Sequence, residues 1–356
     1  MSENFLYILI MLDKIAKLNN GSDAMAQKTM HDVARLAGVS ISTVSRVLSR
    51  DASVEKENRA RVEKAIQDSG YKIRKPARRN EEERKFVALI VPDITNPFYA
   101  TIVKGIEQVA RLHDYGVIVY DSEETIEIEN QNLLAVVRES IRGLIYVSCA
   151  LQTSQVVQDL VESKFPIVFL DRIAEGENTN LVLTDNVEGA YQAVKYLLRL
   201  GHRRIVYIAG TRTTSTERDR FKGYCQALEE EGIATDPALI VNGEYNLDQA
   251  YEGLKELIRN KVEFTAVFSS NDLMAFGVKQ ALEENNLRVP ADVSIVGYDD
   301  INFAHAISLT VISQPIVEMG QSAMTLLLNL IQNRITSPQR IVHRPSLIIR
   351  NSCQRR

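Results

Sequence analysis

The chain has 356 residues, 45% of them hydrophobic and 25% charged, a composition that is ordinary for a folded globular protein and excludes a disordered chain. The formal net charge of -4 hides an asymmetry, because residues 25–79 carry 13 Lys and Arg against 6 Asp and Glu, whereas residues 80–356 carry 27 against 37. A small basic segment ahead of an acidic body favours phosphate binding by that segment alone.

Residues 1–24 precede the basic segment and contain one apolar run, Phe5–Leu12, which is too short to cross a membrane. No basic residue precedes the run, so it is a poor signal peptide and we expect a cytoplasmic protein. We expect translation to begin at Met25, which would leave residues 1–24 untranslated; an accessory helix is the alternative. The cysteines Cys149, Cys225 and Cys353 are widely spaced, as in a reducing compartment without a structural metal.

Residues 29–48 indicate two short amphipathic helices joined by a tight turn. Thr29 supplies an N-cap hydroxyl for the first helix, Gly38 ends that helix, and Ser40 caps the second. Two such helices form a helix-turn-helix, whose second helix enters the major groove of DNA. Their apolar faces are expected to contain Val33, Ala34, Leu36, Ala37, Val39, Val44, Val47 and Leu48.

The exposed face of the second helix offers small hydroxyls and a guanidinium, groups that read base edges. Arg46 is the expected base reader, and a third helix over residues 53–70 would bring exposed cations to the DNA phosphates. The alternative is a pair of surface helices in an unrelated all-α domain. The helices' predicted DNA-binding residues are Thr29, Ser40, Ile41, Ser42, Thr43, Ser45, Arg46, Asn58 and Arg59.

The string DVARLAGVSISTVSRVL, residues 32–48, is far more specific than a generic helix-turn-helix pattern. It resembles the headpiece of the LacI/GalR family of bacterial transcription regulators, and the resemblance continues to the carboxyl terminus. It implies a DNA-binding headpiece over residues 25–75, a hinge over 76–85 and an effector-binding sensor over 86–356. The implied protein is a repressor under allosteric control, a homodimer that binds a pseudo-palindromic operator.

The hinge of this family carries an A-R-x-L pattern whose leucine is driven into the minor groove. The matching residues are Ala77, Arg78, Arg79 and Asn80, so the wedge leucine is absent. We expect Arg78 and Arg79 to enter a narrow minor groove, and we expect less bending of the operator because an apolar wedge is missing.

From Phe86 onwards, apolar runs alternate with helical stretches, which indicates parallel sheets with crossover helices. The expected strands are 86–91, 117–120, 143–147 and 166–170, followed by 205–208, 239–241, 266–268 and 294–297. Two doubly wound lobes would place a ligand at the carboxyl ends of their strands. This α/β arrangement resembles the periplasmic-binding-protein fold, with lobe 1 about 86–184 and 315–342, lobe 2 about 185–313 and 343–356, and crossings near Thr184, Gln314 and His343.

Polar and aromatic residues collect directly after these strands. Carboxylates beside Arg or Asn form the donor and acceptor array that sugar hydroxyls need, and aromatic rings offer faces for a sugar. Taken singly, an Asp at the end of a strand is usually a cap or turn residue. Together the set resembles the pocket of the family's ribose-sensing branch, which implies a pentose such as ribose; a hexose or a purine or nucleoside is the alternative. The implied effector-binding residues are Asn96, Phe98, Tyr99, Asp171, Arg172, Arg220, Tyr245, Asn271, Asp299 and Gln314.

Sequence motifs of enzymes are missing: there is no G-x-G-x-x-G, Walker A, H-E-x-x-H or G-x-S-x-G sequence, so we expect neither an enzyme nor a bound cofactor. His202 is expected to be a structural surface histidine, because no metal ligand stands at a suitable spacing. A secreted sugar-binding transport protein is the rival for the two lobes. The dimer surface is expected near a helix containing Leu326, Leu327, Leu328 and Leu330.

Overall fold

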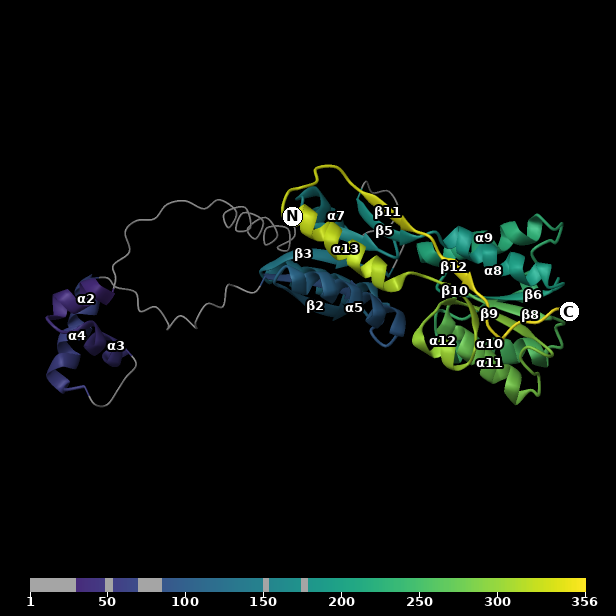
Figure 1. The fold of residues 1–356 in the computed structure, drawn as a ribbon, viewed down its shortest axis with the longest axis horizontal. Helices are drawn as coiled ribbons and strands as arrows, with labels where there is room; N and C mark the ends of the chain where they lie inside the picture. Colours follow the sequence, from purple (N-terminus) through teal and green to yellow (C-terminus); the bar gives the residue numbers. More distant parts are fainter. Residues whose placement is uncertain (1–29, 49–53, 70–84, 150–153, 174–178) are drawn as a thin grey trace. The chain divides into compact units, whose positions relative to one another are not determined.

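The computed structural model describes residues 30–48, 54–69, 85–149, 154–173 and 179–356. The chain divides into two compact units, the first within residues 1–83 and the second over residues 84–356 (Figure 1). The first unit is helical where it is described, and the second contains two six-stranded sheets.

The first unit contains α2 (Met30–Ala37), α3 (Ile41–Leu48) and α4 (Lys56–Ser69). Gly38 takes a left-handed φ of 63° between α2 and α3, a conformation that glycine adopts without steric cost. The Ser40 hydroxyl accepts a hydrogen bond from the backbone N–H of Thr43 at 3.1 Å, as predicted for the cap of α3. The helices share a small core of Val33, Ala34, Ala37, Val44, Val47, Val62 and Ala65.

Leu36 does not belong to this core, contrary to the prediction, and is 59% exposed. At 100° per residue, Val33, Ala34 and Ala37 lie within one arc, and Leu36 lies roughly 100° from its centre. The third helix also begins later than predicted, at Lys56 rather than near residue 53.

In the second unit, lobe 1 has the strand order β11-β5-β4-β3-β1-β2, with every neighbouring pair parallel. Its strands are β1 (Lys85–Val91), β2 (Tyr115–Asp121), β3 (Ile141–Tyr146), β4 (Ile167–Leu170), β5 (Asn180–Thr184) and β11 (Arg340–His343). The core on one face of the sheet includes α5 (Pro97–Leu112) and α13 (Ile316–Ile331), and the core on the other face includes α6 (Ile126–Arg138) and α7 (Gln155–Glu162).

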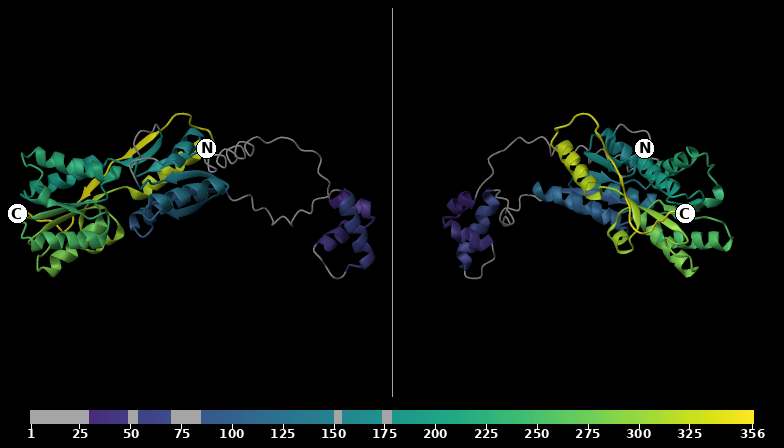
Figure 2. Two further views of the ribbon diagram at one scale, coloured as in Figure 1. Left: turned by 180° about the vertical axis from the view of Figure 1, so that it is seen from behind. Right: turned by 45° about the vertical axis from the view of Figure 1, so that its right-hand side comes forward.

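Lobe 2 repeats this order as β12-β10-β9-β8-β6-β7. Its strands are β6 (Ile205–Ala209), β7 (Ile240–Asn242), β8 (Ala266–Ser269), β9 (Ser294–Asp299), β10 (Thr310–Ser313) and β12 (Ser346–Ile348), the last antiparallel to β10. The helices are α8 (Asn186–Arg199) and α9 (Ser215–Glu229) on one face, α10 (Leu247–Arg259) and α11 (Asp272–Glu284) on the other, with the short η1 (Pro237–Leu239) and α12 (Asn302–Ala306) in connections. Figure 2 shows both lobes from two further directions.

In each lobe the order reverses at one strand, because β1 lies between β2 and β3 and β6 lies between β7 and β8. A crevice opens at the carboxyl ends of strands where the order reverses, so the topology gives each lobe a place for a ligand. The chain passes between the lobes three times: between β5 and α8, between β10 and α13, and between β11 and β12. The two lobes are therefore joined by three short connections.

The leucines of α13, a helix expected near the dimer surface, belong to the core of lobe 1. Leu326, Leu327 and Leu328 are at most 5% exposed and pack against sheet residues of lobe 1, and Leu330 is partly buried against the same core. His202 is also not at the surface, since it is 3% exposed and its ring nitrogens lie 2.9 Å from the Thr265 hydroxyl and 3.2 Å from the Gln354 carbonyl oxygen.

The contact between α5 and α13 allows a test of the packing. A Cβ added at Gly105 would overlap the carbonyl oxygen of Val317. We expect Gly105→Ala to lower the free energy of unfolding by about 1–3 kcal/mol, although alanine is the better helix former by about 1 kcal/mol. Urea unfolding of the full chain measures this. Gly232→Ala serves as a reference, because that position has open space and its left-handed φ alone should cost roughly 1–2 kcal/mol. Unchanged or increased stability in Gly105→Ala would contradict the packing.

Candidate functional site

Residues from both lobes surround one small cavity at the carboxyl ends of the strands. From lobe 1 come the start of α5 and the turn after β4; from lobe 2 come α9, the start of α11 and the end of β9. The free space inside is about 20 Å³, room for about one water molecule, because the side chains close on one another. Nine of the ten predicted effector residues line it, namely Asn96, Phe98, Tyr99, Asp171, Arg172, Arg220, Tyr245, Asn271 and Asp299, together with Thr216.

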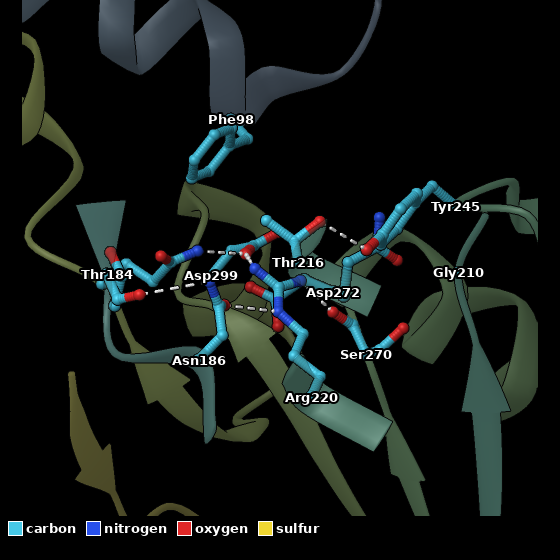
Figure 3. A network of polar contacts seen from close by, with 12 residues as sticks. Phe98, Thr184, Asn186, Gly210, Thr216, Arg220, Tyr245, Ser270, Asp272 and Asp299 are labelled. Carbon is cyan, nitrogen blue, oxygen red and sulfur yellow. Dashed lines mark hydrogen bonds and ion pairs between the residues drawn. The ribbon is translucent and has the colours of Figure 1, made fainter. Parts of the chain in front are cut away.

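Arg220 lies at the centre of this group, and its guanidinium is 4% exposed (Figure 3). Its Nε donates to the Asn186 side chain at 2.8 Å, and its Nη1 donates to the carbonyl oxygen of Ser270. Its Nη2 lies 3.7 Å from an oxygen of Asp299, and the guanidinium lies 3.9 Å from the centre of the Tyr298 ring. Contacts on several sides fix the orientation of a buried cation, which is what recognition of a polar ligand requires.

Arg172 is the second buried guanidinium, with a side chain 5% exposed. Two of its nitrogens donate to the two carboxylate oxygens of Glu124, at 3.3 and 3.1 Å. Its guanidinium also lies 5.1 Å from the centre of the Tyr245 ring. A bidentate pair of this kind compensates the buried charge and holds the plane of the guanidinium.

Gln314 differs from the other predicted residues because it does not line the cavity. Its Nε2 instead donates to Asp299 at 2.8 Å, so it positions that carboxylate. Asp299 is the last residue of β9 rather than a residue after the strand, which corrects the predicted strand end. Burial raises the pKa of Asp299 against the opposing effects of Arg220 and Gln314.

The two asparagines are helix caps as well as cavity residues. The Asn96 side-chain oxygen accepts from the N–H of Phe98 at 3.0 Å, and that of Asn271 accepts from Met274 at 2.9 Å. Each cap uses only the amide oxygen, so the N–H groups can still donate to a ligand. Each asparagine can therefore cap its helix and bind a ligand at the same time.

Several polar atoms around the cavity are buried without a partner in the part of the chain that the structure describes. Asp171 Oδ1 and Arg172 Nε belong to residues that line the cavity, whereas Asp272 Oδ1, Tyr298 OH and Gln314 Oε1 belong to neighbouring residues that do not line it. Leaving a buried polar group unpaired costs about 1–3 kcal/mol, so such groups mark where another molecule supplies the missing hydrogen bonds. The group includes a cation donor and carboxylate acceptors, which matches hydroxyls because a hydroxyl can both accept and donate.

The backbone around the cavity is strained at residues other than glycine. Left-handed φ angles occur at Glu123 (49°), Glu124 (54°), Asp171 (62°), Glu244 (50°), Tyr245 (56°) and Asp299 (110°). Each such residue costs roughly 1–2 kcal/mol, and strain of this kind collects where side chains must be aimed at a ligand.

The helix-turn-helix presents the other predicted site. Ile41 is 41% exposed and Arg46 is exposed on α3, while Thr43 is half-buried beside the Ser40 cap. Ser42 and Ser45 belong to the same helix. Thr29, Ala77, Arg78 and Arg79 lie outside the described residues, as does the hinge with Asn80.

On α4, the residues predicted to contact phosphates are less free than expected, because some are partly buried or hydrogen-bonded within the headpiece. Arg59 is half-buried rather than exposed, and the Asn58 side chain donates to Glu55 at 3.3 Å. Arg61 is exposed and donates to the carbonyl oxygen of Gly38 at 3.2 Å, so it satisfies the end of α2.

Glu124, Thr216 and Asn186 were missed by the sequence analysis. Glu124 follows β2 and Asn186 follows β5, so the rule that polar residues gather after strands would have found both had it been applied to every strand. Thr216, in the first turn of α9, lies 3.1 Å from the Tyr245 hydroxyl. No signal in the sequence distinguishes it from other threonines at helix starts.

A helix-turn-helix unit and a two-lobed α/β unit with a polar cavity between its lobes define a DNA-binding regulator with a ligand sensor. The family described as "Bacterial regulatory proteins, lacI family" matches residues 29–73, and "Periplasmic binding proteins and sugar binding domain of LacI family" matches residues 84–351. The chain belongs to the LacI family of bacterial regulatory proteins. It is accordingly a transcriptional regulator and not an enzyme.

Three similar proteins illustrate the relationship. The ribose operon repressor of Haemophilus influenzae is 34% identical over 327 residues, which cover 91% of this chain and 98% of that protein. The structure of the regulator CelR in complex with cellobiose has a TM-score of 0.70 and 30% identity, and covers 92% of this chain and 100% of that one. A LacI family regulator from Enterococcus faecium with bound ribose has a TM-score of 0.69 and 29% identity, over 76% and 100% of the two chains.

Among the described residues, no helix is long and apolar enough to cross a membrane. The same residues contain no cluster of three or more His, Cys, Asp and Glu side chains that could hold a metal ion.

Asp272 gives a pH-dependent test of the site. Its Oδ2 accepts from the N–H of Ile301 at 2.9 Å, and burial, together with the nearby charge of Asp299, raises its pKa well above the usual range. A carboxyl with a raised pKa holds its proton to higher pH in the folded state than in the unfolded state. The stability that it contributes is therefore full below the unfolded pKa of about 3.9 and is lost as pH rises.

We expect Asp272→Asn, which keeps the acceptor for Ile301, to gain about 1–3 kcal/mol of stability relative to the wild type between pH 5 and pH 8. Urea unfolding at the two pH values measures the difference. Asp292→Asn is the control, because the Arg288 pair lowers the pKa of Asp292 to about 2 and its effect should be constant over this range. Parallel curves for Asp272→Asn and the wild type would contradict the assigned pKa direction.

Proposed function

We propose that this regulator is a repressor whose affinity for operator DNA is controlled by a small sugar, a pentose such as ribose, bound between the two lobes. The observation that carries the proposal is the convergence of polar side chains from both lobes on one cavity, where Asp171 and Arg172 each keep a buried atom without a partner among the described residues. A ligand that pairs them favours the closed arrangement of the lobes, and only a ligand with different affinity for two arrangements can shift their balance.

The residue types match a sugar well. Asp171 and Asp299 accept from hydroxyls, Arg172 and Arg220 donate to them, and the rings of Phe98 and Tyr99 pack edge to face with centres 5.2 Å apart at the side of the cavity. Ribose in the Enterococcus faecium regulator and cellobiose in CelR support a sugar as the class of effector. A hexose or a nucleoside is the alternative. Because the free space is small, the lobes must separate to admit any of these.

For the DNA-binding unit we propose a homodimer in the cytoplasm, since one helix-turn-helix reads only one half-site of a palindromic operator. The second helix, α3, would lie in the major groove with Arg46 at base edges. We place the dimer surface on the lobes, near α13, where the exposed side chains of that helix and not its buried leucines would contact the partner.

Arg46→Ala should weaken binding to the operator by about 1–3 kcal/mol and relax specificity at one base position. Fluorescence anisotropy with a set of single-base operator variants measures both effects. Arg35→Ala removes the same charge from α2, where the side chain is 80% exposed and paired with Asp32, and should weaken all sequences slightly and alike. A uniform loss across the variants for Arg46→Ala would show that Arg46 contacts phosphate only.

Asp171→Asn should abolish sugar binding, or weaken it at least about tenfold, because an amide replaces a carboxylate that accepts from hydroxyls. Thermal-shift and calorimetric screens of pentoses, hexoses and nucleosides identify the ligand, since one at 100 times its Kd adds ~2.7 kcal/mol of stability. Asp114→Asn, in an exposed turn after α5, is the control and should leave binding intact. A response to nucleosides alone, or unchanged sugar binding in Asp171→Asn, would contradict the proposal.

A further inference from the structure

The opening that leads into the cavity carries charge of one sign. It has a volume of about 820 Å³ and shares Asn96 and Tyr245 with the cavity, so the two are continuous. Among the described residues, its lining includes five carboxylates, Asp93, Asp121, Glu123, Glu124 and Glu244, and no lysine or arginine. An anion that enters such an opening is repelled, because a concave wall of one charge concentrates its field on whatever passes through.

The cations inside the cavity are already compensated. Glu124 holds Arg172 through two hydrogen bonds, and Asp299 lies 3.7 Å from Arg220. The nearest cation along the chain, Arg212, donates to the side chain of Asn242 at 3.1 Å and is not part of the lining. A phosphate monoester needs cationic donors, and the described residues of the cavity offer no guanidinium without a carboxylate partner.

The backbone holds Glu124 in position for its contact with Arg172. Glu123 and Glu124 are successive residues with left-handed φ angles, which glycine would adopt without strain. The N–H of Glu123 donates to Asp121 at 3.0 Å, and the N–H of Glu124 donates to the carbonyl oxygen of Pro92 at 2.7 Å. A strained backbone that carries a long acidic side chain into a bidentate contact points to a requirement for that carboxylate.

The pairing leaves one donor of Arg172 for a ligand. Its Nε is buried without a partner among the described residues, as is Asp171 Oδ1 beside it. A neutral hydroxyl can accept from the first and donate to the second. A phosphate oxygen can only accept, and it would also face the carboxylates of Glu124 and Asp171.

We propose that Glu124 is a specificity-determining residue, which together with the acidic opening restricts the effector to uncharged polyols and rejects their phosphate esters. This inference rests on the proposed function, because it refines the chemistry of the same cavity. It names the class of reaction that removes the signal: phosphorylation of the sugar would convert an effector into a compound that the sensor does not bind. The regulator would thus respond to the free sugar and not to its phosphorylated product.

Calorimetric titration of the full-length protein with three matched pairs tests this: ribose and ribose 5-phosphate, glucose and glucose 6-phosphate, adenosine and adenosine 5′-monophosphate. For the pair whose uncharged member binds, we expect the phosphate to bind at least about tenfold more weakly. We also expect the ratio of the two Kd values to become smaller at high salt, because salt screens the repulsion. A phosphate that binds as tightly as its uncharged partner overturns this inference and leaves the sugar-sensor function standing. Absence of binding by all six compounds overturns the proposed function, and this inference with it.

Glu124→Gln separates the charge from the shape of the side chain. In this variant the ratio of the Kd of the phosphate member to the Kd of the uncharged member should fall about tenfold, whatever affinity the uncharged member loses when Arg172 loses its carboxylate partner. Glu127→Gln is the matched control, since Glu127 is exposed in the first turn of α6 and does not line the opening. The ratio of the two Kd values in this control should equal that of the wild type. If Glu124→Gln and the wild type have the same ratio of affinities for the uncharged ligand and its phosphate ester, Glu124 does not determine specificity.

Discussion

Two guanidinium groups buried between the lobes are the constraint on which the rest of the site depends. Removing a cation from water costs several kcal/mol unless carboxylates and carbonyl oxygens surround it. Arg172 is compensated by Glu124, and Arg220 by Asp299, Asn186 and the carbonyl oxygen of Ser270. Several loops therefore have to converge on one point, and their strained backbone is a consequence of that convergence.

The fold makes such convergence possible without long loops. Both lobes have the same order of their first five strands, so each presents the ends of its central strands towards the cavity. Helices that begin directly after these strands use Asn96 and Asn271 as caps, which brings side-chain amides to the same place. Among the described elements three chain connections join the lobes, and these would have to accommodate a change of lobe separation.

Much of this could be predicted from the sequence, because apolar runs such as 86–91 and 205–208 are long enough to identify buried strands. The strands that escaped prediction are β5, β10, β11 and β12, of three to five residues; β11 and β12 lie at sheet edges and alternate between exposed and half-buried residues. Most cavity residues could be predicted because they follow strands, whereas Arg220, inside α9, was implied only by the resemblance to the LacI/GalR family. The same rule places Glu124 near the cavity because it follows β2, but its pairing with Arg172 joins positions 48 residues apart and could not be predicted from a local pattern.

The central claim is that a ligand in the inter-lobe cavity and DNA on the helix-turn-helix influence one another. Equilibrium linkage requires the influence to be equal in both directions. The direct measurement is the Kd of the sugar with and without saturating operator, selected in vitro, and the Kd of the operator with and without saturating sugar. The account predicts one common factor, different from one, for both ratios; a factor of one in both would show that the cavity does not control DNA binding.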